Sequence, residues 1–167
     1  MEVEIRSERS DGESGRLLLA GFAAEIASIY PGWTMSVGPS AEPADFAPPG
    51  GNFLVAYAGG RPVGCGGLKR LDDEAVELKR LYVVDDMRGA GLARTLVRAL
   101  EAAAAAAGYT VVRLDTGSDQ PEALKLFQTA GYTPIPDYNQ NPAASYWFEK
   151  RLSRSSPASP RADSATA

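Results

Sequence analysis

The chain has 167 residues, of which 44% are hydrophobic, 17 are lysine or arginine and 21 are aspartate or glutamate. Its length suits one domain with a sizeable core, and the formal net charge of −4 argues against nucleic acid as a general partner. The sequence contains no histidine and one cysteine, Cys65, which excludes Ser-His-Asp and Cys-His catalytic sites, an internal disulfide, and zinc sites built from histidine or several thiolates. We therefore expect no metal, and acid–base chemistry falls to Glu, Asp, Tyr, Lys or water.

The N-terminal third combines one short strand, one helix and a long loop. Val3–Arg6 alternates and predicts a strand, and apolar residues at helical spacing predict a helix over 15–30, ending before Pro31. Residues 31–51 are rich in Pro, Gly, Ala and Ser and predict a long loop with at most a short helical turn. Loops of this length in compact domains are often functional, so this one is assigned to substrate access, with a plain connection as the alternative.

A hairpin follows the loop. Residues 53–58 and 61–71 predict two antiparallel strands joined at Gly59-Gly60, a typical primed-turn pair. Three glycines surround Cys65 in the second strand, which indicates a bulge or the close approach of another group, and this segment is a candidate cavity wall. Cys65 itself is expected to be a packing residue, since nothing basic in the local sequence would lower its pKa.

A strand over 76–84 leads through glycines into a helix that ends at Gly108. The junction reads Arg88-Gly89-Ala90-Gly91-Leu92-Ala93. The first N–H groups of a helix lack intrahelical partners and carry the positive end of its dipole, so the junction favours an anion such as a pyrophosphate. The alternative is a tight turn that binds nothing.

The C-terminal part begins with a strand over 110–115, which follows a helical crossover and should therefore lie parallel to the strand over 76–84. A helix is expected from Asp119–Pro121 to Gly131, followed by strands over 132–135 and 145–152. From Ser153 the composition is Ser, Pro, Ala and Arg without periodicity. We expect one domain over residues 1–152 and a disordered tail over 153–167.

This order of elements resembles the GNAT superfamily of acetyl-CoA-dependent N-acetyltransferases. The family signature is Arg or Gln, two residues, Gly, one residue, then Gly or Ala, which Arg88 to Ala93 matches; residues 123–132 look like the family's second helix and the strand after it. The resemblance covers residues 3–152 and implies a mixed α/β fold, with a central sheet of six to seven strands flanked by about four helices. A dinucleotide-binding Rossmann motif fits less well, because its third glycine position holds Arg94 and the turn lies mid-chain after a hairpin.

The resemblance also implies how acetyl-CoA would be bound as co-substrate. Backbone amides would hold the pyrophosphate, with the side chains of Arg88 and Arg94 adding charge; the amides belong to Arg88, Gly89, Ala90, Gly91, Leu92, Ala93 and Arg94. Strand-edge groups of Leu81, Tyr82 and Val83 would bind the pantetheine arm like an added strand, at a point where the strand pair parts near a bulge. Gln120 occupies the place of an asparagine that touches the cofactor in many members, and a helix-start role is its alternative.

Acetyl transfer to an amine needs a base, and an acid can assist departure of the thiolate. Glu77 lies where several relatives place the base; alternation puts Lys79 on the same face, so a solvated pair of opposite charge is the alternative. The family's usual acid, a tyrosine on the second helix, is replaced here by Phe127. Either the thiolate leaves unaided or another tyrosine serves, for which Tyr132, Tyr138 and Tyr146 are the candidates.

The acceptor is expected to be a small-molecule amine. Asn139 and Asn141, with Tyr138, lie in a loop expected near the reaction centre and are candidate substrate contacts, although Asn and Pro in this loop equally suit turns. A protein amine is an alternative acceptor, and a non-catalytic acyl-CoA sensor is an alternative function, favoured by Phe127. With no apolar run suited to a signal peptide or a membrane span, we expect a cytoplasmic monomer or homodimer without nucleic-acid or membrane partners.

Overall fold

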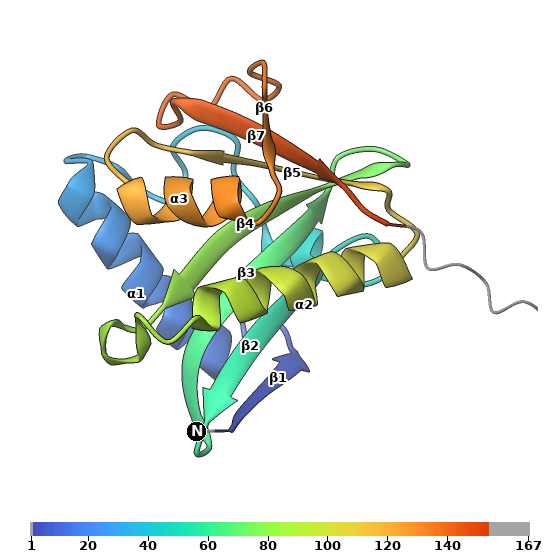
Figure 1. Ribbon diagram of the computed structural model, residues 1–167. Helices are drawn as coiled ribbons and strands as arrows, with labels where there is room; N and C mark the ends of the chain where they lie inside the picture. Colours follow the sequence, from blue (N-terminus) through green and yellow to red (C-terminus); the bar gives the residue numbers. More distant parts are fainter. Residues whose placement is uncertain (1, 154–167) are drawn as a thin grey trace, which may run out of the picture.

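A computed structural model describes residues 2–153 of the chain. Over this range, seven strands form one mixed sheet in the order β1-β2-β3-β4-β5-β7-β6 (Figure 1). The strands are β1 (Val3–Ser7), β2 (Asn52–Ala58), β3 (Arg61–Arg70), β4 (Ala75–Val83), β5 (Val111–Thr116), β6 (Thr133–Ile135) and β7 (Tyr146–Arg151). The helices are α1 (Glu13–Ile29), α2 (Leu92–Ala106) and α3 (Pro121–Thr129), with 3-10 turns η1 (Pro43–Phe46) and η2 (Asp85–Met87).

The mixed α/β fold predicted from the sequence is confirmed. Every predicted strand and helix is present, and β4 and β5 are parallel, as expected of a helical crossover. Three α-helices and two 3-10 turns take the place of about four helices, and η1 is the short helical turn within the loop over 31–51. Except for Ser153, the tail expected to be disordered lies outside the described residues.

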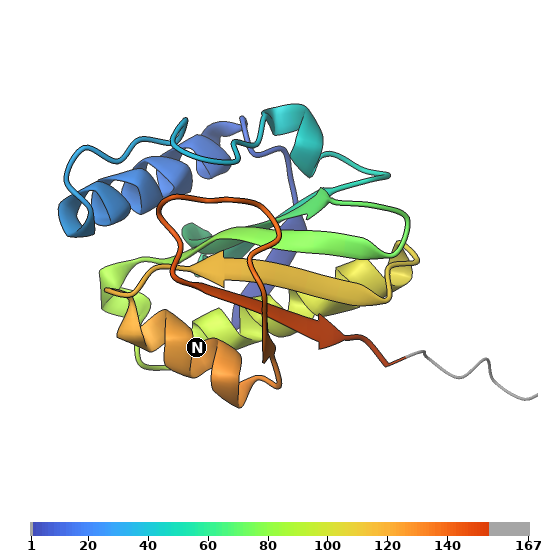
Figure 2. The same cartoon turned by 90° about the horizontal axis from the view of Figure 1, so that it is seen from above.

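The helices cover both faces of the sheet. Helix α1 lies on one face and helices α2 and α3 on the other (Figure 2). Strand β2 is buried on both faces: Phe53, Val55 and Tyr57 pack in the cluster that contains Leu18 of α1, whereas their neighbours Leu54, Ala56 and Ala58 pack toward α2. This double coverage explains why β2 reads as a continuous apolar run.

The glycines of β3 admit side chains from both layers. A Cβ on Gly66 would lie 2.6 Å from Leu100 of α2, and one on Gly67 would lie 2.5 Å from the ring of Phe46. Close approach is therefore the reason for these glycines, and the expected cavity beside them is filled by core side chains. Cys65, directly before Gly66, is fully buried, as expected of a packing residue, and this burial raises the pKa of its thiol to about 12.

Strands β4 and β5 pair over a short stretch and then part. Their ladder joins Ala75–Glu77 to Val111–Arg113. Beyond it, β4 stays paired with β3 but carries a bulge, where the register shifts between Cys65 and Gly67 of β3 and Arg80 adopts a left-handed φ of 58°. From Leu78 onward, the edge of β4 that faces β5 has no strand partner in the part of the chain that the structure describes.

Candidate active site

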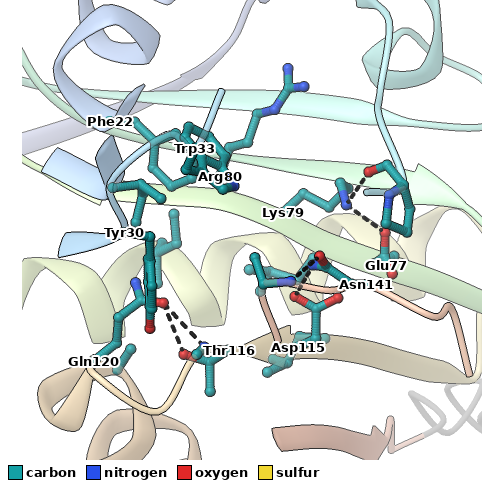
Figure 3. Close-up of a pocket in the computed structure, with 18 of the residues that line it drawn as sticks. Phe22, Tyr30, Trp33, Glu77, Lys79, Arg80, Asp115, Thr116, Gln120 and Asn141 are labelled. Carbon is teal, nitrogen blue, oxygen red and sulfur yellow. Dashed lines mark hydrogen bonds and ion pairs between the residues drawn. The ribbon is translucent and has the colours of Figure 1, made fainter. Parts of the chain in front are cut away.

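A cavity of about 170 Å³ lies where β4 and β5 part (Figure 3). One side is formed by Leu78–Leu81 of β4, by residues 114–117 at the end of β5, and by α3 with the residue before it. The other side is formed by α1 and the loop that follows it, which contributes Trp33, Met35, Val37 and Pro39. The long loop therefore lines the cavity, as its assignment to substrate access requires.

The glycine junction forms an open turn at the start of α2. Gly89 and Gly91 both have a φ of 83°, and Gly91 is the N-cap residue of the helix. A Cβ on either glycine would meet no atom within 4 Å, so the space in front of the turn is free. The N–H groups of the first helical turn have no intrahelical partner. The site therefore fits a pyrophosphate bound by backbone amides.

The two arginines of the junction are engaged by other protein groups. Arg88 donates from Nε to the carbonyl of Val83 over 2.9 Å and binds the Glu25 carboxylate of α1 with both terminal nitrogens, over 2.8 and 2.9 Å. The hydrogen bonds that Arg88 donates to Glu25 raise the pKa of Arg88. Arg94 donates to the Thr129 hydroxyl over 2.5 Å. Contrary to expectation, then, the charge of Arg88 is compensated by Glu25, and its side chain ties the turn to α1.

The residues expected along the pantetheine arm lie at the unpaired edge of β4 and opposite it. Tyr82 and Val83 pair with β3, which leaves their other strand edge without a partner strand among residues 2–153. Gln120 lines the cavity from the N-cap position of α3. Its side-chain carbonyl accepts from the Gly117 amide over 3.2 Å, so Gln120 also stabilises the turn that begins the helix.

Glu77 lies in the cavity wall at the point where the strands part. Its side chain shares a face with Lys79, whose Nζ is 3.0 Å from Oε1, while Oε2 accepts from the Tyr138 hydroxyl and, over 3.2 Å, from the Asn139 amide. The pair of opposite charge that was the alternative reading is present, but it is not solvated, because Glu77 is 3% exposed. The loop between β6 and β7, which was expected near the reaction centre, covers Glu77 through these two contacts.

Asp115 is a second carboxylate in the cavity and was missed in the sequence. Its Oδ2 accepts from Asn139 over 2.6 Å and its Oδ1 from Asn141 over 3.2 Å. Both predicted asparagines thus meet at Asp115, and Asn141 also lines the cavity. Because Arg113 pairs with Glu77 in the parallel ladder, strand alternation places Asp115 on the same face as Glu77; the sequence alone does not give this register.

Two of the candidate tyrosines, Tyr132 and Tyr146, lie outside the cavity wall. Tyr132 packs edge-on against Phe127 with ring centroids 5.5 Å apart, its hydroxyl is buried without a partner, and burial raises its pKa. The expectation that Tyr132 is the acid is therefore corrected: the structure places it in the core rather than in the cavity wall. Tyr146 is 41% exposed on β7, away from the lining.

Tyr138 and Tyr30 differ in what their hydroxyl protons can do. Tyr138 donates its proton to Glu77, and burial next to that carboxylate raises its pKa, so it supports Glu77 and does not suit an acid. Tyr30, at the C-cap of α1, lines the cavity, and its hydroxyl accepts from the Asp119 amide over 3.1 Å. Among residues 2–153 no group accepts a hydrogen bond from this hydroxyl, so its proton can be donated to a ligand. In the sequence Tyr30 was only the last residue of a helix.

Two further findings concern the part of the chain over 2–153. No group of three or more His, Cys, Asp or Glu side chains is placed to hold a metal ion there. None of its helices combines the length and the apolar character needed to cross a membrane.

Comparison with known proteins assigns the family. The model of the acetyltransferase (GNAT) family matches residues 21–132. The chain belongs to this family. It is 35% identical to the IAA acetyltransferase of Azospirillum brasilense over 111 residues, which make up 64% of this chain and 71% of that protein.

Two further proteins similar to this chain are longer or more distant. The chain is 36% identical to N-acetyltransferase family 8 member 2 of Rattus norvegicus over 93 residues, 53% of this chain, but it spans 41% of that relative's length. The crystal structure of a GNAT family acetyltransferase from Elizabethkingia anophelis with acetyl-CoA bound has the same fold, with a TM-score of 0.63 and 17% identity, over 90% of this chain and 98% of that one.

Proposed function

We propose that this protein transfers the acetyl group of acetyl-CoA to a small-molecule amine, both bound in one complex. The observation that carries the proposal is a continuous path: the free edge of β4 runs from the two carboxylates at the parting of β4 and β5 to the open glycine turn at α2. Family membership supports the reaction class. The path offers separate binding positions for the pantetheine arm and for the pyrophosphate of an acyl-CoA molecule.

The donor would be held mainly by backbone groups. The amides between Arg88 and Arg94 bind the pyrophosphate, and the edge of Leu81, Tyr82 and Val83 binds the pantetheine arm as an added strand. Gln120 faces the same channel from α3. Since the guanidinium of Arg88 is bound to Glu25, it contributes by fixing the turn.

Side chains of this protein would take up and supply the protons of the reaction. Acetyl-CoA supplies a thioester that a neutral amine attacks: the C–N bond forms as the C–S bond breaks, and the second proton that the nitrogen loses balances the proton that the departing sulfur gains. We assign Glu77 as the base that takes the proton from the acceptor's ammonium, because it lies in the cavity wall where the strands part. Tyr30, at the opposite wall, is positioned to return a proton to the leaving sulfur in place of the tyrosine that Phe127 replaces.

The test measures acetyl-CoA binding and CoA release separately. Acetyl-CoA is expected to raise the melting temperature, and a panel of primary amines is expected to release free CoA from it. Binding with no CoA release for any small amine or lysine-containing peptide would favour the sensor alternative. Absence of binding would reject both. In Tyr30→Phe, a kcat lowered about 10-fold or more with an unchanged KM for acetyl-CoA would support the acid role.

A further inference from the structure

The polar end of the cavity carries more negative than positive charge. Glu77 and Asp115 both accept from the same Asn139 Nδ2, over 3.2 and 2.6 Å, so the two carboxylates lie close together. Lys79 pairs with Glu77. Arg113, the ladder partner of Glu77 in β5, forms an ion pair with Glu149 over 3.2 Å. Among residues 2–153, no lysine or arginine forms an ion pair with Asp115.

Arg80 lines the cavity but does not complement Asp115. Its guanidinium donates to the Ala41 carbonyl over 3.0 Å and stacks over the ring of Phe46. Figure 3 shows this side chain directed away from Glu77 and Asp115. At the end of the cavity that holds Glu77 and Asp115, the described lysine and arginine side chains are therefore paired with other carboxylates, whereas Asp115 has no ion-pair partner.

The two asparagines that bind the Asp115 carboxylate are themselves oriented by further hydrogen bonds. Asn139 accepts from Trp147 Nε1 over 2.9 Å and Asn141 accepts from the Ala143 amide over 3.0 Å, so both side-chain amides must present their NH₂ groups to Asp115. Each Asp115 oxygen then carries one of these hydrogen bonds and retains acceptor capacity for another donor. By contrast, Oε2 of Glu77 accepts two hydrogen bonds and Oε1 is paired with Lys79, so Oε1 is the Glu77 oxygen with capacity left to take a proton.

The opposite wall is apolar and aromatic. Phe22 and Trp33 meet edge to face with ring centroids 6.0 Å apart, and Met35 and Val37 extend this surface. In Figure 3 the two rings lie together, apart from Asp115 and Asn141. A ligand spanning the cavity thus meets a carboxylate at one end and aromatic rings at the other.

We propose that Asp115 binds the ammonium group of the acceptor, and that the acceptor is a primary amine on an apolar or aromatic body without a carboxylate next to the amine. This inference rests on the proposed function and specifies its substrate class. Asp115 orients the ammonium, and Glu77 takes one of its protons before the nitrogen attacks. An α-amino acid would bring its carboxylate to the end of the cavity where negative charge is already in excess.

The test compares matched pairs of acceptors in the full chain: phenethylamine with phenylalanine, and tryptamine with tryptophan. CoA release should show kcat/KM at least 10-fold higher for each amine than for its amino acid. Asp115→Asn should raise the KM for phenethylamine about 10- to 100-fold, the range expected for a lost charge-assisted hydrogen bond, with the KM for acetyl-CoA within 2-fold of wild type.

Two controls separate binding from folding. Asp137→Asn removes an exposed carboxylate that accepts from the Asn139 and Gln140 amides in the same loop, and it should leave the KM for phenethylamine within about 3-fold. The uncharged analogue 2-phenylethanol should inhibit wild type far more weakly than the amine binds, and Asp115→Asn should reduce that discrimination about 10-fold or more.

The outcomes distinguish this inference from the function on which it rests. Equal or better turnover of the amino acids, an unchanged KM in Asp115→Asn, or equal losses in Asp115→Asn and Asp137→Asn would overturn the inference while the acetyltransferase assignment stands. No CoA release with any acceptor of either kind would overturn both.

Discussion

Glu77 shows at the level of one residue how stability and catalysis overlap in this site. Its carboxylate is 4% exposed and its partner Lys79 is 13% exposed, so Glu77→Gln leaves a largely buried ammonium without its counter-ion. We expect the free energy of unfolding to fall by about 3 kcal/mol, measured by denaturant titration. Adding Lys79→Met should restore most of this loss, because the unpaired charge is removed as well.

The same pair of variants tests the base. If Glu77 takes the proton from the acceptor, the double variant regains stability while kcat stays low, with the largest loss at low pH, where the amine is hardest to deprotonate. Recovery of kcat together with stability would instead make Glu77 a structural residue. Measuring kcat against pH for all three proteins decides between the two.

Cys65 offers a second residue-scale prediction. Burial raises its pKa to about 12, so at pH 8 the thiolate fraction in the folded state is on the order of 1 in 10,000. Iodoacetamide should modify the native protein at least about 100-fold more slowly than the guanidinium-unfolded chain. Since the unfolded thiol ionises first, stability should also fall as the pH rises above about 9. Rapid native labelling at pH 8 would show that β3 opens readily.

The two ends of helix α2 provide a matched comparison at the level of one element. Gly91 precedes the helix with a φ of 83° and Gly108 follows it with a φ of 94°, and a Cβ on either would meet no atom within 4 Å. Valine at either position should therefore cost a similar backbone strain, roughly 1–2 kcal/mol. Only Gly91→Val places a side chain where the pyrophosphate is expected, so only this variant should raise the KM for acetyl-CoA, by about 10-fold or more.

Comparing steady-state kinetics with thermal unfolding separates the two effects of these variants. Similar losses of melting temperature combined with a KM change confined to Gly91→Val would assign the turn to the donor. Equal KM values for both variants would mean that the glycines serve only the strand-to-helix connection.

The helices and strands were predictable because each has its own residue periodicity and its own residues that mark where it begins and ends. Strand β4 alternates, α2 begins and ends at glycines, and the crossover between β4 and β5 dictates a parallel pair. What the sequence could not supply were features that depend on a second segment. The bulge at Arg80 is defined against β3, and the burial of Glu77 depends on a loop sixty residues away in sequence, through Tyr138.

The candidate site was predictable to the extent that it lies on one such element. The glycine turn was located by its local pattern, and Asn139 and Asn141 by their clustering. Tyr30 and Asp115 were missed because α1 and β5 bring them to the cavity only in the folded chain. Tyr132 was assigned to the site although it lies in the core, because the sequence pattern of an aromatic residue after a helix is the same whether its side chain faces the core or the site.

At the scale of the whole molecule, the sheet consists of two parts joined over a short seam. Strands β1 to β4 form one part and β5 to β7 the other, and three residue pairs connect them at Ala75–Glu77. Beyond the seam, the two parts diverge around the cavity. A pantetheine arm bound along the free edge of β4 would lie between them and link both parts through hydrogen bonds.

Hydrogen exchange should detect this link. Acetyl-CoA at about 100 times its Kd stabilises the folded state by about 2.7 kcal/mol, and we expect amides of β4 beyond Leu78 and of β5 to gain protection together with the start of α2. The nucleotide part of CoA, ending at the pyrophosphate, fills only the glycine turn and should protect the start of α2 without protecting β5. If both ligands protect the same amides, or acetyl-CoA leaves β4 unchanged, the arm does not lie between the strands. The parting of β4 and β5 would then serve the acceptor alone.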